Sequence, residues 1–259
     1  MVLESILNPI FGPLLNLPPF WAVLIIAFVI ALLITLVYKW MTDQHLMKSL
    51  KDEIKTFQQQ MKEFKHDPKK VMDIQKRAMQ TNMKYMMHSM KPTLITFLPI
   101  IIIFGWLHAN IAFEPIMPGQ EFLVGAEFQQ GVVGEMNLKV FEFVEGEKVI
   151  AENVEILVDS TQEITEGKAE WRLKGEEGLY SLDYIYEDRS YSKELLITSE
   201  QAYKEPVTKI NDDKIKLLGT IHEKTSPLQI FGWKIGWLGT YIIFSIVFSM
   251  SLRKILKLH

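Results

Sequence analysis

The sequence predicts an α-helical membrane protein with three transmembrane helices, a cytoplasmic helical hairpin of the coiled-coil type and an extracytoplasmic β-sandwich domain. Three features of this 259-residue chain support it. Three long stretches carry no charge, a basic segment separates the first two, and an acidic segment rich in β-forming residues separates the last two. The predicted boundaries are 1–18 for a surface or re-entrant segment, 19–38 for the first span, 39–91 for the hairpin, 92–113 for the second span, 114–228 for the β domain, 229–252 for the third span and 253–259 for a basic tail.

The three spans follow from charge-free stretches at residues 5–38, 92–113 and 235–252, which are 34, 22 and 18 residues long. A helix needs roughly 20 apolar residues to cross the hydrocarbon core of a bilayer. Tryptophans lie near the ends of these stretches, at the depth where aromatic belts form. They are Trp21, Trp106, Trp233 and Trp237.

The first eighteen residues differ from a cleaved signal, because no Lys or Arg precedes their apolar run and no small-residue cleavage site follows it. Pro9, Pro13 and Pro18 interrupt the segment. We therefore predict that it lies on the membrane surface, or dips into it, before the first span begins at Pro19.

The charges predict the orientation in the membrane. Residues 39–91 hold 12 Lys and Arg against 6 Asp and Glu, whereas residues 114–227 hold 12 against 24. The C-terminus adds Arg253, Lys254 and Lys257. Basic residues near span ends favour the cytoplasmic side, so we predict a multi-pass protein of the cell membrane with its N-terminus outside and its C-terminus inside. The chain has no cysteine, which suits an external domain on a prokaryotic surface.

Residues 39–91 have the spacing of two helical arms. Apolar residues in the first arm alternate steps of four and three, which is a coiled-coil seam; they are Leu50, Ile54, Phe57, Met61 and Phe64. Asp67 suits a helix N-cap and Pro68 the first helical position, so the second arm begins there. That arm carries two adjacent stripes. One is Val71, Ile74 and Ala78, and the other is Met72, Met79, Met83, Met86 and Met90.

Methionine is concentrated in this hairpin, since nine of the thirteen methionines lie between residues 41 and 90. Methionine is flexible and polarizable, so it is common both as core filler and on surfaces that bind many partners. Both interpretations stay open here. The candidate client-binding residues are Met79, Met83, Met86, Met87 and Met90.

Residues 115–227 alternate or run with β-forming residues between glycine and acidic turns, which predicts five to seven short strands in an antiparallel sandwich, with the immunoglobulin type as one possible form. Tyr180, Leu182 and Tyr184 alternate on one face of a late hairpin. We find no catalytic constellation in the sequence and expect no enzyme activity, no cofactor and no metal site.

Polar residues inside the spans are candidates for a groove. Tyr241, Ser245 and Ser249 are four apart and the row continues to Arg253, so they share a helix face. Thr96 in the second span is a further candidate. The first span ends with Thr35, Tyr38 and Lys39, which are further candidates. The row could line a partly hydrated groove, or the hydroxyls could bond only their own helix backbone. No charge lies mid-span, which argues against a proton relay or ion pathway.

The motifs "MKPTLITFLPIIIIFGWLH" and "GWLGTYIIFSIVFSMSLRKILKLH", together with the basic hairpin, resemble archaeal members of the YidC/Oxa/Alb insertase superfamily. They are also similar to the insertase subunits of the ER membrane protein complex and of the tail-anchor pathway. The resemblance covers residues 19–113 and 228–259. It implies a groove of three helices, open to the cytoplasm and to lipid, and a hairpin that meets clients or ribosomes. Bacterial members carry an arginine inside a span; here Lys39 or Arg253 would have to supply the positive charge.

The resemblance therefore implies a membrane protein insertase with chaperone-like capture of hydrophobic segments. The expected partners are nascent membrane proteins, membrane lipids and a ribosome or translocon, without sequence-specific recognition of nucleic acid. Two rival functions remain. One is a membrane anchor that displays the β domain for binding or envelope structure, and the other is an ion channel or transporter, which would favour charged residues or broken helices within the spans.

Overall fold

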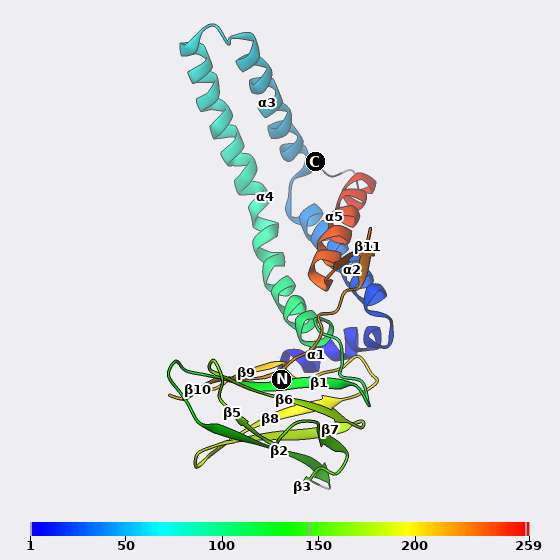
Figure 1. Ribbon diagram of the computed structural model, residues 1–259. Coiled ribbons are helices and arrows are strands. Elements are labelled where there is room, and N and C mark those ends of the chain that lie inside the picture. Colours follow the sequence, from blue (N-terminus) through cyan, green and yellow to red (C-terminus); the bar gives the residue numbers. More distant parts are fainter. Residues whose placement is uncertain (1, 145, 257, 259) are drawn as a thin grey trace. The chain divides into compact units, whose positions relative to one another are not determined.

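The computed structural model describes residues 2–144, 146–256 and 258. Lys257 and His259 of the predicted basic tail lie outside the described residues. The chain divides into two compact units, which are described separately (Figure 1). One comprises Met1–Asn8, Phe20–Trp106 and Pro227–His259, and the other Pro9–Pro19 and Leu107–Ser226.

The N-terminal segment is helical. Helix α1 covers Val2–Phe11, a short 3₁₀ helix η1 covers Gly12–Asn16, and helix α2 begins at Pro19 and ends at Met41. Proline at the first position of α2 costs no hydrogen bond, because the N–H groups of the first turn have no partner within a helix. The Trp106 indole donates a hydrogen bond of 2.7 Å to the Asn8 side-chain oxygen, which ties α1 to the second span.

Two helices form the predicted hairpin: α3 covers Gln44–Glu63 and α4 covers Pro68–Ile111. Asp67 accepts a hydrogen bond from the Lys70 backbone N–H at 3.2 Å, so the predicted cap is confirmed. In the seam Leu50 and Phe57 are buried, and the Arg77 guanidinium lies 5.1 Å from the centre of the Phe57 ring.

The predicted seam includes one residue too many at its C-terminal end, Phe64. Phe64 is 39% exposed, because it stands at the C-cap of α3 where the chain leaves the helix. Its ring instead lies 5.0 Å from the Lys70 ammonium group.

The second arm and the second span are one helix. Helix α4 has 44 residues and continues through Pro92 and Pro99, which makes it about 66 Å long at a rise of about 1.5 Å per residue. Each proline removes one backbone N–H from the helix ladder. By length and apolar composition α2, α4 and α5 are able to cross a membrane, so the three predicted spans have three helices to match them.

The third span begins later than predicted. Helix α5 covers Trp237–Ile255, whereas residues 229–236, which we assigned to it, mostly form a hairpin of β11 (Leu228–Ile230) and β12 (Trp233–Ile235). Positive φ angles at Phe231 and Gly232 turn the chain back between these strands. The helix also runs beyond residue 252, because Arg253 and Lys254 in its last turn interact favourably with the helix dipole.

The three apolar helices pack through aromatic edges. The Phe28 and Phe248 rings join α2 to α5 with centroids 5.3 Å apart, and the Phe104 and Tyr241 rings join α4 to α5 at 4.7 Å. The buried stripe of α2 is made of small and branched residues at helical spacing, which allows close approach of the neighbouring helices. It consists of Ala22, Val23, Ile26, Ala27, Ile30 and Ala31.

The β domain contains two antiparallel sheets (Figure 1). The strands of the first, in spatial order, are β4 (Val154–Ile156), β6 (Lys168–Gly175), β1 (Glu121–Phe128), β10 (Ile215–Thr220) and β9 (Val207–Lys209). The second has β3 (Glu147–Ile150), β2 (Glu135–Val144), β7 (Gly178–Tyr186) and β8 (Arg189–Ile197), with β5 (Thr161–Glu163) paired to β2.

Both sheets contribute to one core. The Trp171 ring of β6 lies 5.6 Å from that of Tyr184 in β7, and both side chains are fully buried. The predicted hairpin is confirmed, because β7 and β8 pair in continuous antiparallel register and Tyr180, Leu182 and Tyr184 all face the core. The strand count of five to seven is too low, since ten strands occur among the described residues of this domain. Four of the ten have only three or four residues, which is too short for an alternating pattern to show.

The end of α4 is capped by a loop of the β domain. The Tyr203 hydroxyl donates to the His108 carbonyl at 2.6 Å and accepts from the Ala112 backbone N–H at 3.0 Å. Burial raises the pKa of Tyr203 to about 12. The Gln201 amide donates to the Phe113 carbonyl at 3.1 Å. These bonds serve backbone groups that a helix terminus leaves without intrahelical partners.

Two tyrosine substitutions should therefore have different effects on the stability of the β domain. Tyr203→Phe removes a hydroxyl that bonds two backbone groups, so we expect a loss of about 1–3 kcal/mol in the free energy of unfolding. Tyr184→Phe is the matched control, because the described residues give its buried hydroxyl no hydrogen-bond partner. We expect that change to be neutral or stabilising. Thermal unfolding followed by near-UV circular dichroism measures both, and equal losses would contradict the assignment of the cap.

Candidate functional site

Two hollows lie among the apolar helices. The first, which we call the arginine hollow, has a volume of about 220 Å³. Its lining comes from three helices: Ile34 and Tyr38 of α2, Tyr85, Ser89, Met90, Pro92, Thr93 and Thr96 of α4, and Arg253 of α5. It lies where α4 passes from its charged part to its apolar part.

Aromatic and cationic groups bring the three helices together here. The Arg253 guanidinium lies 5.1 Å from the centre of the Tyr38 ring, a cation–π distance. The Tyr38 and Tyr85 side chains, from α2 and α4, both line this hollow. A positive charge is thereby held at the wall of the hollow, where it could attract an acidic group.

The second hollow, the serine hollow, has a volume of about 300 Å³. It is lined by Ala31 and Ile34 of α2 and by Tyr241, Ser245, Ile246, Ser249 and Met250 of α5. Ile34 lines both hollows, so the two are neighbours. The face of α5 that the sequence singled out therefore does line a concave surface.

The structure separates the predicted groove residues into two groups. Thr96 and Arg253 line the arginine hollow, and Tyr241, Ser245 and Ser249 line the serine hollow. Thr35 and Lys39 line neither of these two hollows. Thr35 is buried against its own helix and Lys39 is exposed. Of the two cations named as substitutes for a mid-span arginine, Arg253 is the one at the hollow.

Several hydroxyls also bond their own helices. Thr96 donates to the Pro92 carbonyl at 3.0 Å, Ser245 to the Ile242 carbonyl at 2.9 Å, and Thr35 to the Ala31 carbonyl at 2.6 Å. Thr96 and Ser245 thus line a hollow and also bond their own helix backbone, so the two interpretations of these hydroxyls are compatible. A hydroxyl that donates to its own backbone keeps its oxygen lone pairs available to a group in the hollow.

The five candidate client-binding methionines of α4, which from here on are called the methionine stripe, are not covered by other described side chains. Ile74 and Thr81 on the neighbouring face are buried, whereas the five candidate methionines are between 46% and 64% exposed. They are Met79, Met83, Met86, Met87 and Met90. Hairpin packing therefore does not account for them. Met90 also lines the arginine hollow, so the stripe and the hollow share a residue.

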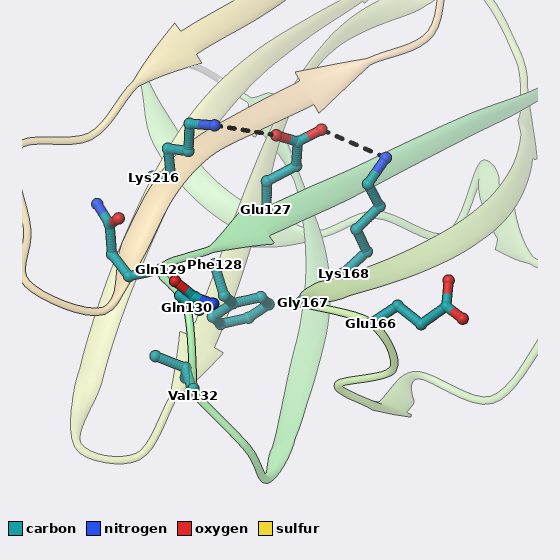
Figure 2. Close-up of a pocket in the computed structure, with 10 residues that line it drawn as sticks. Glu127, Phe128, Gln129, Gln130, Val132, Glu166, Gly167, Lys168 and Lys216 are labelled. Carbon is teal, nitrogen blue, oxygen red and sulfur yellow. Dashed lines mark ion pairs between the residues drawn. The ribbon is translucent and has the colours of Figure 1, made fainter.

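A further hollow of about 480 Å³ lies in the β domain (Figure 2). Glu127 points between Lys168 and Lys216, at 3.4 and 4.0 Å. These charges pair with one another on the surface, where such pairs contribute little. None of the predicted site residues lies here, and we base no function on this hollow.

The family comparison matches residues 4–141 to the family described as integral membrane protein EMC3/TMCO1-like. The chain belongs to this family. The EMC3/TMCO1-like family is part of the YidC/Oxa1/Alb3 insertase-related superfamily, so the predicted superfamily membership is confirmed. No curated protein and no solved structure matches the chain.

The extent of the EMC3/TMCO1-like match differs from the resemblance seen in the sequence. It includes residues 4–18, all of β1 and most of β2, which we had placed outside the shared part. It ends before residues 228–259, which we had placed inside. The methionine stripe and most of the lining of the arginine hollow lie within the match, whereas Arg253 and the serine row of α5 lie beyond it.

The sequence did not single out Tyr85 and Ser89 as groove residues, although both line the arginine hollow. Tyr85 and Ser89 stand one helical turn apart, and the next turn brings Thr93. Polar residues four apart, which share one helix face and lead into the apolar part of α4, were the available signal. Methionines stand between these polar residues in the sequence and made the pattern hard to recognise.

The serine hollow should admit water more readily than the lipid-facing side of the same helix. We compare Ser245→Cys with Val247→Cys, which lies at nearly the same depth and is 51% exposed on α5. A thiol reacts as its thiolate, which requires a polar surrounding. We therefore expect a small water-soluble thiol reagent to modify position 245 clearly faster in membrane vesicles. Equal rates would show that the hollow is as dry as the lipid.

Proposed function

We propose that this chain is a membrane protein insertase, which captures hydrophobic segments on the methionine stripe and passes them to the hollows between its spans. The observation that carries the proposal is Met90, because it belongs both to the exposed stripe and to the lining of the arginine hollow. Membership of an insertase-related superfamily supports it.

The stripe suits a partner that varies in sequence. Positions 79, 83, 86, 87 and 90 share one face of α4 and extend over about 16 Å, the length of three helical turns. Unbranched methionine side chains adapt to different apolar shapes. Lysines of the same arm lie nearby and favour a position close to anionic lipid head groups.

The hollows would help with the polar flank of the client. A charged or strongly polar group at the bilayer centre costs several kcal/mol. Hydroxyls of Tyr38, Thr96 and Ser249, together with any water that they hold, offer hydrogen bonds along part of the path. Arg253 offers a positive charge to an acidic tail. No bond is broken, and the client leaves sideways into lipid.

The proposal requires the hairpin to face the cytoplasm, where nascent chains, ribosomes or a translocon are met. The excess of Lys and Arg in residues 39–91 and of Asp and Glu in residues 114–227 supports this orientation in the cell membrane.

Accessibility of single cysteines measures the orientation. Ser49→Cys lies in α3 and Ser190→Cys in β8, and both positions are exposed in a chain that otherwise has no cysteine. We expect a membrane-impermeant thiol reagent added to whole cells to label position 190 and to reach position 49 only after the cells are broken. External labelling of position 49 would exclude the proposed path for clients.

Changing the five methionines tests capture. Replacing all five with glutamine removes apolar area while it preserves side-chain length. Full burial of one such side chain contributes roughly 1.5–3 kcal/mol, so even partial burial of two or three should weaken capture by more than about tenfold. Photo-crosslinking to ribosome-bound nascent chains with a hydrophobic segment measures the effect.

The matched control replaces the same five methionines with leucine. It keeps the apolar area and reduces flexibility, so we expect crosslinks to persist for some clients and to weaken for others. Circular dichroism of both variants shows whether α4 remains helical. A folded glutamine variant that crosslinks as well as the wild type would refute a capture role for the stripe.

A further inference from the structure

The hairpin before α5, which we call the aromatic hairpin (Leu228–Ile235), has two different faces. Its register pairs Leu228 with Ile235, Gln229 with Lys234, and Ile230 with Trp233. Directly opposed residues share a face and neighbours along a strand alternate, so the four apolar side chains share one face. The other face holds Gln229 and Lys234. A shallow hollow of about 360 Å³ on the apolar side is lined by Ile230, Phe231, Trp233 and Ile235.

The tip of the hairpin is strained and uncovered. Phe231 has a φ of 50° and Gly232 of 83°, the positive pair that a two-residue turn of this kind requires. Asparagine or glycine normally occupies the first of these positions, and a bulky residue there is unfavourable. Phe231 is nevertheless fully exposed, and Trp233 is 80% exposed. An aromatic side chain kept in an unfavourable conformation suggests a function for it at the tip.

The position of the hairpin in the chain indicates what covers it. Only Gly236 separates it from α5, and the Thr240 hydroxyl of α5 donates to the Gly236 carbonyl at 3.0 Å. Ile235 also lies close against Gly239 in the first turn of the helix. The hairpin is therefore held at the end of a membrane span. Tryptophan and phenylalanine at that depth are typical of side chains that enter the interface of a bilayer.

We propose that the aromatic hairpin inserts its apolar face and its Phe231 tip into the bilayer at the membrane interface beside the start of α5. A two-stranded hairpin has two open edges whose backbone groups lack strand partners, and such groups are costly in hydrocarbon. The hairpin therefore lies at the level of the head groups and first methylene groups. Lys234, on the opposite face, points toward lipid phosphates and water. An isolated hairpin is marginally stable in water, so lipid also stabilises its fold.

Insertion there has a consequence for α5. The uncharged part of this helix, from Trp237 to Leu252, is about 24 Å long, which is less than a hydrocarbon core of about 30 Å. A wedge of apolar side chains at its end covers part of this mismatch and holds the helix end at a fixed depth. The inference rests on the membrane-spanning character of α5 and does not depend on client capture.

Environment-sensitive fluorophores on single cysteines test the proposal in the 259-residue chain, which has no cysteine of its own. An NBD group is placed at Phe231→Cys on the tip, with Gln229→Cys as the matched control on the polar face. A second pair, Trp233→Cys on the apolar face and Lys234→Cys on the polar face, repeats the comparison with Phe231 still in place. Each protein is reconstituted into phosphatidylcholine vesicles that contain lipids with a spin label near the head group or deep in the acyl chain.

We expect the shallow spin label to quench positions 231 and 233 more strongly than the deep one, and aqueous iodide to quench them several-fold less than positions 229 and 234. Equal iodide quenching within both pairs would show that the hairpin lies in water, and would overturn the proposal. Protection from iodide without quenching by spin-labelled lipid would also overturn it, because a protein surface would then be the partner.

Discussion

The rest of the molecule depends on the need of a backbone in lipid to satisfy its own hydrogen bonds, and α4 meets that need as one uninterrupted helix. The same helix carries the methionine stripe, one wall of the arginine hollow and the segment that ends in the β domain. Pro92 removes a backbone N–H at the wall of the hollow, so the carbonyl four residues earlier loses its usual donor. Hydroxyls at Thr93 and Thr96 donate to other carbonyls of this stretch, at 3.2 and 3.0 Å. Helix α4 nevertheless continues through Pro92.

Local bonding also explains how a polar surface is tolerated among apolar helices. The donors of Thr96 and Ser245 are satisfied within their own helices, so these two hydroxyls leave no unpaired O–H among the apolar helices. Their remaining lone pairs are available when a polar group enters. The charge of Arg253 at the end of α5 is tolerated in a similar way. Its guanidinium lies against the Tyr38 ring while the side chain stays exposed. The hollows can therefore be polar without a charge buried at mid-span.

Elements with a long, regular sequence pattern were predicted correctly, whereas elements of only a few residues were missed. Charge-free stretches identified three apolar helices, and alternation along Tyr180, Leu182 and Tyr184 identified the β7–β8 hairpin. The aromatic hairpin was mistaken for helix, because a short continuous apolar run has no periodicity that separates strand from helix. The choice between Lys39 and Arg253 depended on how α2 and α5 pack. Helical spacing fixes which residues share a face, but the neighbouring helices decide whether that face is concave.

Two exposed apolar surfaces outside the spans differ in chemistry, and the difference fits different partners. The stripe on α4 is made of exposed methionines, whose flexible side chains adapt to different apolar shapes, as the proposed capture of clients requires. The aromatic hairpin presents Phe231 and Trp233, which are rigid and have few rotamers to lose. Rigid aromatic groups suit an environment that is always present and has no fixed shape to match, as lipid does. Flexible groups suit partners that differ in shape and must leave again. Under the two proposals made here, a chain that used one kind of side chain for both surfaces would either hold its clients too rigidly or anchor its third helix too loosely.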